Sequence, residues 1–411
     1  MSGADTRQAC DYAAFASTEF ASTIGGDSLT ASMTIVVPEC AFDPLKAFSA
    51  LVSDVAAAYA DEATSAPWIV AFSGGKDSTI LADIVFQALL ETSPSRRTRP
   101  IHIVSNDTLV ESPLVMGHLR VVQSEIAEAA RVLNLPITVV TTQPTVDQSF
   151  WVNLIGRGYP SPNRTMRWCT DRLKITPTSN YVVESVNQNG AVVIVLGVRR
   201  DESATRRQSI DKRGEDNPNT FTRHDSLLGA WVYRPIMNVS TDQVWEMLAS
   251  KSPSWGGSHT ALITLYREAS GGECPVVMSA DDAPGCGTNS SRFGCWTCTV
   301  VEKDKSLQGF VDIGKHEFMP LLDFRDWLKS IRNEPAMRSS IRRNGVLTFN
   351  PGGKHIPGPF TVNARRMILD RLLQTQQAFG TELVTPAELD RIQQIWSQDL
   401  LTEHGTLADA A

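Results

Sequence analysis

Short apolar runs alternate with longer segments of helical periodicity through the first half of the chain. Over 42–63 the apolar residues recur every three or four positions, which predicts an amphipathic helix. Four further runs are apolar almost without interruption, which is typical of strands buried on both faces of a sheet. They lie at 67–72, 100–107, 136–142 and 190–198, and helical patterns over 77–92 and 112–134 separate the first three.

This alternation predicts an α/β fold in which a parallel sheet is flanked by helices. Ligands of such sheets bind at the carboxyl ends of the strands. The loops that should therefore converge are those that follow Phe72, Val104, Val140 and Leu196.

The pattern divides the chain into four segments. Residues 1–41 are rich in Ala, Ser, Thr and Gly and are expected to be an irregular extension. Residues 42–251 carry the α/β pattern and end in a predicted helix that Ser240 caps. A Cys-rich segment over 252–305 follows, and 306–411 are expected to be mainly helical with a basic surface.

The composition indicates a globular protein. Of its 411 residues, 42% are hydrophobic and 20% charged, and no apolar run is long enough to cross a membrane. Without a secretory signal pattern, a cytoplasmic location is expected. The net charge is −7, yet 325–371 hold ten Lys or Arg against three acidic residues, a local balance of +7. That segment is either a surface for a phosphate backbone or an ordinary solvated basic face.

The sequence FSGGKDST, residues 72–79, lies between a predicted strand and a predicted helix. Gly74 and Gly75 allow a tight turn whose N–H groups point at an anion, and the positive end of the helix adds to the attraction. Lys76 supplies a charge, and Ser73 and Ser78 supply hydroxyl donors. The loop is not a Walker A loop, because its first glycine is missing and Asp77 follows the lysine.

SGGKDS resembles the loop of the N-type ATP pyrophosphatases, and GVRRDESATRR (197–207) resembles an element of their phosphoadenosine phosphosulfate (PAPS) reductase branch. The resemblance implies a PP-loop fold like that of the adenine nucleotide alpha hydrolases, and cleavage of ATP to AMP and pyrophosphate. It implies catalytic roles for Lys76, Asp77 and Arg199, with Mg2+ carried by Asp77 and Asp107. The implied nucleotide ligands are Ser73, Gly74, Gly75, Asp77, Ser78, Thr79, Asp107, Arg199, Arg200, Glu202 and Arg206.

Four of the seven cysteines lie within 25 residues, at Cys274, Cys286, Cys295 and Cys298. Four thiolates at this spacing can close around one inorganic centre. A zinc ribbon normally has two Cys-x-x-Cys pairs, and only one is present, so zinc is the second choice. A 4Fe-4S cluster accepts irregular spacing. Dithiol chemistry is third, because the expected strand-to-helix context is missing.

Cys169 stands apart from this group, in MRWCTDR. The neighbouring Arg164, Arg167 and Arg172 are expected to lower the pKa of its thiol and raise the thiolate fraction. It is a candidate catalytic persulfide carrier or alternative cluster ligand, although a buried structural thiol is comparably consistent with the sequence.

SSRFGCWTCTVVEKDKSLQGF (290–310) and GKHIPGPFTVNARRMILDRLL (353–373) resemble blocks of the DndC and SspD type of sulfur-transfer protein of bacterial DNA phosphorothioation. The resemblance implies a 4Fe-4S cluster, adenylation of a DNA phosphate, and sulfur supplied by a cysteine desulfurase together with other phosphorothioation proteins. Three alternatives remain: a tRNA-thiolating enzyme, a sulfonucleotide reductase, and a non-enzymatic iron–sulfur or zinc scaffold that docks partners.

Overall fold

The computed structural model describes residues 42–61, 65–202, 207–208, 210–211, 217–270 and 293–408. Three predicted site residues, Arg206, Cys274 and Cys286, and the predicted extension over 1–41 lie outside these ranges. Among the described residues, no helix combines the length and apolar character needed to cross a bilayer. The predicted segment boundaries stay a prediction.

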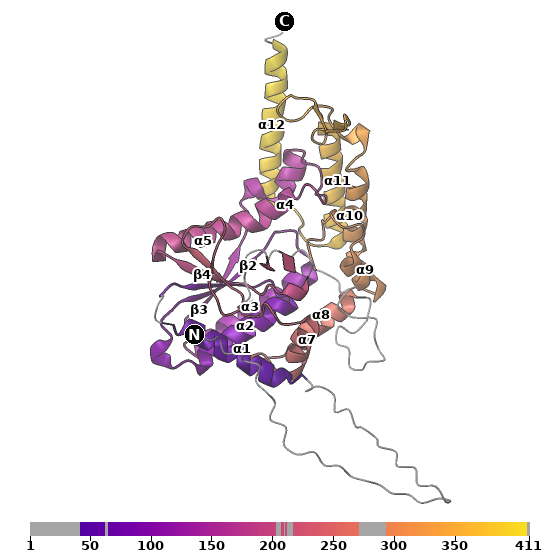
Figure 1. The fold of residues 1–411 in the computed structure, drawn as a ribbon. Helices are drawn as coiled ribbons and strands as arrows, with labels where there is room; N and C mark the ends of the chain where they lie inside the picture. Colours follow the sequence, from indigo (N-terminus) through magenta and orange to yellow (C-terminus); the bar gives the residue numbers. More distant parts are fainter. Residues whose placement is uncertain are drawn as a thin grey trace, which may run out of the picture. The chain divides into compact units, whose positions relative to one another are not determined.

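A six-stranded sheet, ordered β3-β2-β1-β4-β6-β5, organises the N-terminal half (Figure 1). Every neighbouring pair is parallel except β5 and β6. The strands are β1 Trp68–Ala71, β2 Ile101–Asn106, β3 Ile137–Thr142, β4 Val192–Val195, β5 Thr222–Arg223 and β6 Ala230–Tyr233. The four apolar runs of the sequence are thus β1 to β4, and the mostly parallel sheet confirms the predicted fold class.

Helices cover both faces of this sheet. On one face Val182 of α5 packs against Ile69 and Val104, and on the other face Tyr59 of α1 meets Trp68 edge-on at 5.5 Å. Figure 1 shows α5 on the opposite side of the sheet from α1 and α2. The α-helices of this half are α1 Pro44–Tyr59, α2 Lys76–Glu91, α3 Pro113–Val132, α4 Trp168–Thr170, α5 Thr176–Asn189, α7 Thr241–Ser250 and α8 Thr260–Ala269.

Short helical turns connect these elements. Two of them are π-helical: Val152–Gly156 precedes the segment that leads into α4, and Asp171–Ile175 follows α4 directly. The 3-10 turns are Pro94–Arg96, Val146–Gln148, Arg200–Glu202, His316–Phe318 and Pro335–Met337. At α7 the predicted cap is present as a reciprocal capping box. Ser240 Oγ accepts from the Gln243 N–H at 3.1 Å, and the Gln243 side chain accepts from the Ser240 N–H.

The C-terminal part is mainly helical, as predicted. Its helices are α9 Lys305–Asp312, α10 Met319–Ile331, α11 Val362–Phe379 and α12 Pro386–Ala408, and a hairpin of β7 Thr348–Phe349 and β8 His355–Ile356 interrupts them. Trp151 stands in one hydrophobic core with Trp296 and Phe324, each at a ring distance of 5.8 Å. The described part of the Cys-rich segment and the C-terminal helices therefore share a core with the segment that follows β3.

Candidate functional site

The Gly-rich loop lies between β1 and the first turn of α2, as predicted. Gly74 has a φ of 71°, and Gly75 stands at the N-cap of α2, where glycine has no side chain to cap the helix. Ser78 Oγ closes the loop: it donates to the Gly75 carbonyl at 2.9 Å and accepts from the Ser73 N–H at 3.1 Å. A preformed loop at a helix N-terminus is an arrangement that binds phosphate.

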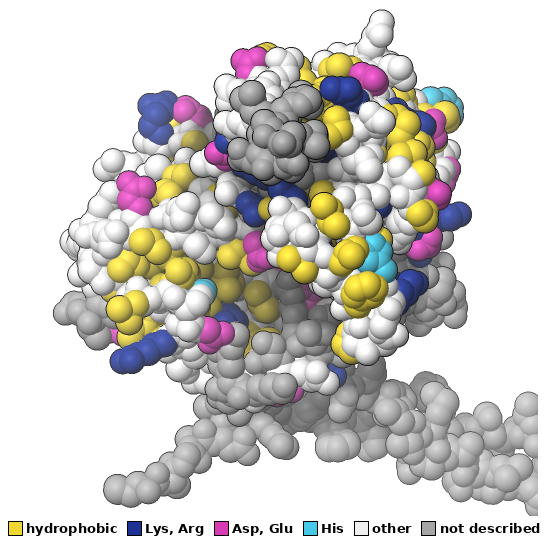
Figure 2. Space-filling model, turned by 90° about the horizontal axis from the view of Figure 1, so that it is seen from above, with side chains coloured by type: hydrophobic (Ala, Val, Ile, Leu, Met, Phe, Trp, Pro, Cys, Tyr) yellow, Lys and Arg dark blue, Asp and Glu magenta, His cyan; other side chains and the backbone are white. Residues whose placement is uncertain are grey.

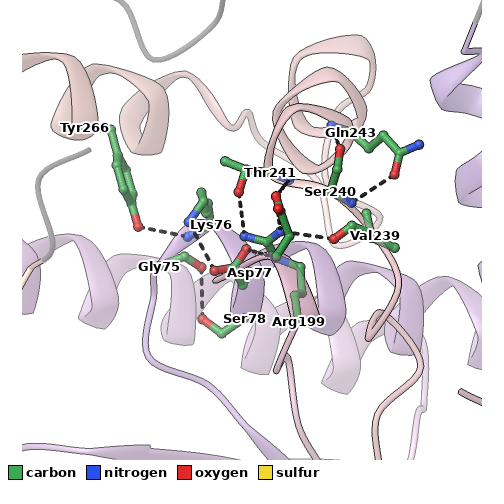
Figure 3. A network of polar contacts seen from close by, with 11 residues as sticks. Gly75, Lys76, Asp77, Ser78, Arg199, Val239, Ser240, Thr241, Gln243 and Tyr266 are labelled. Carbon is green, nitrogen blue, oxygen red and sulfur yellow. Dashed lines mark hydrogen bonds and ion pairs between the residues drawn. The ribbon is translucent and has the colours of Figure 1, made fainter. Parts of the chain in front are cut away.

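A buried arginine lies beside the loop and bonds to Asp77 (Figure 3). Arg199 is fully buried, and its Nε donates to Asp77 Oδ1 at 2.8 Å. Its other nitrogens donate to the Val239 carbonyl and to Thr241 Oγ1, each at 3.0 Å. Asp77 in turn accepts from Lys76 Nζ at 3.1 Å.

The glycine of the Gly-x-Arg element explains how this arginine reaches the loop. A Cβ at Gly197 would lie 3.0 Å from the backbone oxygen of Asp77, tighter than most real contacts, so glycine favours the close approach of the segment after β4 to the start of α2. The Arg199 guanidinium is enclosed and bonded to protein, and it fixes the Asp77 carboxylate. A direct contact of Arg199 with the polyphosphate stays a prediction.

Sequence reasoning missed Tyr266 of α8, because its segment reads as part of a Gly- and Pro-rich insert. The Tyr266 hydroxyl accepts a hydrogen bond from the Lys76 N–H at 3.3 Å, and burial raises the pKa of this hydroxyl. The edge of the Phe293 ring lies against Tyr266, with 4.6 Å between the centroids. A neutral hydroxyl therefore occupies a donor of the loop that an anion would otherwise use, next to the start of the cysteine-bearing turn.

Asp107 lies in the loop after β2, where convergence was expected, and it is buried. Its Oδ1 accepts from the Leu109 N–H at 2.8 Å, its Oδ2 accepts from Gln143 Nε2 at 3.2 Å, and Arg120 is 3.7 Å away. The loops after β2 and β3 thus meet. Among the described residues there is no group of three side chains that could hold a metal ion, so a magnesium role for Asp77 and Asp107 stays a prediction.

Two further predicted nucleotide ligands lie near the end of β4. Arg200 and Glu202 form the turn that follows Arg199, and Arg200 pairs with Asp211 at 3.2 Å. Thr79 is buried in the first turn of α2. Arg206, the remaining predicted ligand, lies outside the described residues.

Cys295 and Cys298 form one tight turn, in which the Cys298 N–H donates to the Cys295 carbonyl at 3.0 Å. Cys295 forms an isolated β-bridge with Glu111, and its Sγ lies 3.4 Å from Thr108 Oγ1. Because Thr108 and Glu111 follow β2 directly, the turn is fastened to the loop that begins at Asp107. The carboxyl end of the sheet therefore carries both the phosphate loop and two thiols.

Cys169 belongs to the same cluster of thiols, although 126 residues separate it from Cys295 in the sequence. Burial, and then the neighbouring Cys298, raise the pKa of Cys169. Burial also raises the pKa of Cys295, with contributions from Glu111 and Cys169. The expected lowering of the Cys169 pKa by neighbouring arginines is therefore wrong. Arg172, which follows Cys169 in the sequence, instead donates to Gln148 and to the Tyr159 hydroxyl.

Much of the predicted basic surface is internal. Arg325 is fully buried and donates to three backbone carbonyls of the turn over 298–302. Arg365 donates to the Gly156 carbonyl at 2.6 Å and pairs with Asp399 at 2.9 Å. Arg332 and Arg338 also donate hydrogen bonds to backbone carbonyls. These arginines hold the C-terminal helices and the cysteine turn together, and the exposed basic surface is smaller than the sequence suggested.

The fold and the loop together define a nucleotide-binding α/β protein of the PP-loop class. The sequence matches the phosphoadenosine phosphosulfate reductase domain family over residues 67–301, more than half of the chain, and the chain belongs to this family. An uncharacterized protein of Methanocaldococcus jannaschii is 26% identical over 188 residues, which are 46% of this chain and 32% of that protein. The chain thus spans about a third of that relative's length.

Several solved structures are similar in fold. An FMN adenylyltransferase of Candida glabrata is 13% identical with a TM-score of 0.33, and covers 57% of this chain and 66% of its own. A PAPS reductase of Candida auris is 11% identical with a TM-score of 0.30, at 50% and 85% coverage. A tRNA thiolase of Methanococcus maripaludis, solved with its 4Fe-4S cluster, is 12% identical with a TM-score of 0.31, at 53% and 70% coverage.

Proposed function

We propose that the protein is an ATP pyrophosphatase coupled to sulfur transfer, and that its substrate is a phosphate of the DNA backbone. The observation that carries the proposal is the locked loop: Arg199 holds Asp77, and Asp77 holds Lys76, at the start of α2. A loop of this kind grips phosphate groups. The thiols of Cys169 and Cys295 lie at the same end of the sheet, which supports a coupling to sulfur chemistry.

In the first step a non-bridging oxygen of the DNA phosphate attacks the α-phosphorus of ATP, and pyrophosphate leaves into the loop. The N–H groups at the start of α2 and the Lys76 ammonium stabilise the charge that grows on the leaving group. Asp77 keeps Lys76 in place and is itself fixed by Arg199. Because these donors are held before ATP binds, little reorganisation is needed during the reaction.

In the second step the terminal sulfur of a persulfide attacks the adenylated phosphorus, and AMP leaves with the replaced oxygen. A second thiol then attacks the sulfur–sulfur bond and releases the phosphorothioate, which leaves a disulfide for an external thiol reductant. Cys169 is the proposed persulfide carrier, and a cysteine desulfurase is the proposed sulfur donor. A cytoplasmic site of action, with other phosphorothioation proteins as partners, belongs to the same proposal.

A 4Fe-4S cluster belongs to the same proposal. Cys295 and Cys298 share one turn and would supply two of its ligands. Cys274 and Cys286 would supply the other two, since the described residues alone contain no group of three side chains that could hold a metal ion. Zinc is the second choice. A bound cluster would supply an iron site for sulfur.

Genomic DNA tests the substrate. A strain that lacks this gene should lose phosphorothioate linkages, measured by mass spectrometry of nuclease digests, and should keep its thiolated tRNA nucleosides. Complementation with the wild-type gene should restore the linkages, whereas Asp77→Ala should not. Unchanged linkages in the deletion strain would refute the DNA substrate, and a loss of thiolated tRNA instead would favour the tRNA alternative.

A further inference from the structure

The segment over 339–357, which contains the hairpin of β7 and β8, is exposed over most of its length. Hydrogen bonds close its base: the Gly358 N–H donates to the Ser339 carbonyl at 2.7 Å, and His355 Nε2 lies 2.6 Å from the Ser340 carbonyl. Arg338 adds hydrogen bonds to the carbonyls of Pro357 and Gly358. The part beyond this base is therefore held in a defined position although it is exposed.

This segment is uniformly basic. From 335 to 369 the sequence contains no Asp or Glu, and the side chains of Arg342, Arg343 and Lys354 are exposed. Burial, and then the neighbouring Arg342, lower the pKa of Arg338 to about 10. Arg342 and Lys354 lie in a stretch that has no acidic residue of its own, while Arg343 lies 3.9 Å from Asp399. Such a run of cations is complementary to a polyanion.

Apolar side chains stand between these cations. Leu347 is 54% exposed and Phe349 57% exposed, and Ile341 and Val346 are nearly as open. Figure 2, which views the molecule from above, shows hydrophobic side chains next to Lys and Arg on the exposed surface. Cations that alternate with apolar groups suit a nucleic-acid groove, where the charges meet phosphates and the apolar groups meet sugars and base edges.

The base of the hairpin also contacts the segment that carries Cys169. The Phe360 N–H donates to the Gly158 carbonyl at 2.7 Å, and Arg343 Nη1 donates to the Arg157 carbonyl at 2.7 Å. From there the chain continues to α4 and Cys169. A duplex on the hairpin is thus held by the same structural unit as the proposed persulfide carrier.

We propose that the hairpin over 339–357 is the docking surface for the duplex DNA substrate. This inference rests on the function proposed above. Arg342 and Lys354 contact backbone phosphates, and Leu347 and Phe349 enter the minor groove. Arg343 has a second role in holding the hairpin against α12, since it also lies 3.9 Å from Asp399.

The test is the binding of a fluorescein-labelled duplex oligonucleotide to the full chain, measured by anisotropy over a series of salt concentrations. An Arg342→Ala/Lys354→Ala variant should raise the Kd roughly tenfold per side chain at about 0.1 M salt, and should lower the slope of log Kd against log salt by about 2. A Leu347→Ala/Phe349→Ala variant should weaken binding at every salt concentration with the slope unchanged.

The matched control removes the same charge elsewhere. Lys46→Ala/Arg131→Ala takes two exposed cations from α1 and α3, each paired only with a nearby surface acid, and should leave the Kd and the slope as in the wild type. Equal effects of Arg342→Ala/Lys354→Ala and of Lys46→Ala/Arg131→Ala on the Kd would overturn the hairpin proposal. Wild-type binding that does not depend on salt would overturn it as well. Phosphorothioate linkages in cells report on the proposed function separately.

Discussion

The buried pair of Arg199 and Asp77 should be one of the most sensitive points of the molecule. In an Arg199→Met variant the side-chain volume is roughly kept, but three hydrogen bonds of 2.8 to 3.0 Å are lost. Asp77, whose side chain is 19% exposed, keeps only Lys76 as a cationic partner. Breaking one side of a buried ion pair costs about 3–5 kcal/mol of unfolding free energy. The loop should also lose its fixed Lys76, so pyrophosphate release from ATP should fall.

The neighbouring Arg200 provides the matched control. It pairs with Asp211 at 3.2 Å, and both side chains are partly exposed, so Arg200→Met should cost no more than about 1 kcal/mol. Guanidinium denaturation followed by circular dichroism measures both variants against the wild type. A loss below about 1 kcal/mol in Arg199→Met, or equal losses in the two variants, would show that Arg199 does not hold the loop as described.

Three further predictions concern single contacts. Ser240→Ala removes half of the capping box of α7 and should lower the unfolding free energy by about 1 kcal/mol in chemical denaturation. Gly309→Ala would place a Cβ 2.5 Å from the Ala269 carbonyl and should lower the unfolding free energy by about 1–3 kcal/mol. Gly117→Ala in α3 meets no atom and should raise it by about 0.5–1 kcal/mol. Changes of the same sign in both variants would contradict the close packing of α8 and α9. Although burial opposes its charge, the nearby His259 and Lys251, which donates a hydrogen bond, lower the pKa of the Asp83 carboxyl. Its contribution to the unfolding free energy is therefore full above about pH 4 and is lost as the pH falls further, and Asp83→Asn should flatten this acid limb in denaturation titrations.

The sequence was sufficient for the elements that carry a strong hydrophobic pattern. The runs that became β1 to β4 are apolar on both faces, and the glycines of the phosphate loop punctuate the chain between β1 and α2. The sequence did not predict the short strand β6 or the helix α8, because four apolar residues after Gly229 and a helix within a Gly-rich stretch give weak local signals. Tyr266 lies on that helix and was therefore not predicted either.

Burial of charge was the harder problem. Arg325 and Arg365 look like surface cations in the sequence, and only the turn over 298–302 and the carbonyl of Gly156 reveal why they are internal. The proximity of Cys169 and Cys298 was not predicted for the same reason: tertiary packing brings together positions that no local pattern links. Desolvation then outweighs nearby cations, which reverses the pKa direction that the sequence suggested.

The products formed from ATP test the central claim most directly. Purified protein, with duplex DNA, a sulfur donor and partner proteins present, is incubated with radiolabelled ATP, and the nucleotides and phosphates are separated. The locked loop predicts AMP and pyrophosphate in equal amounts, with both lost in Lys76→Ala. Formation of ADP and phosphate, or no turnover of ATP, would contradict the account.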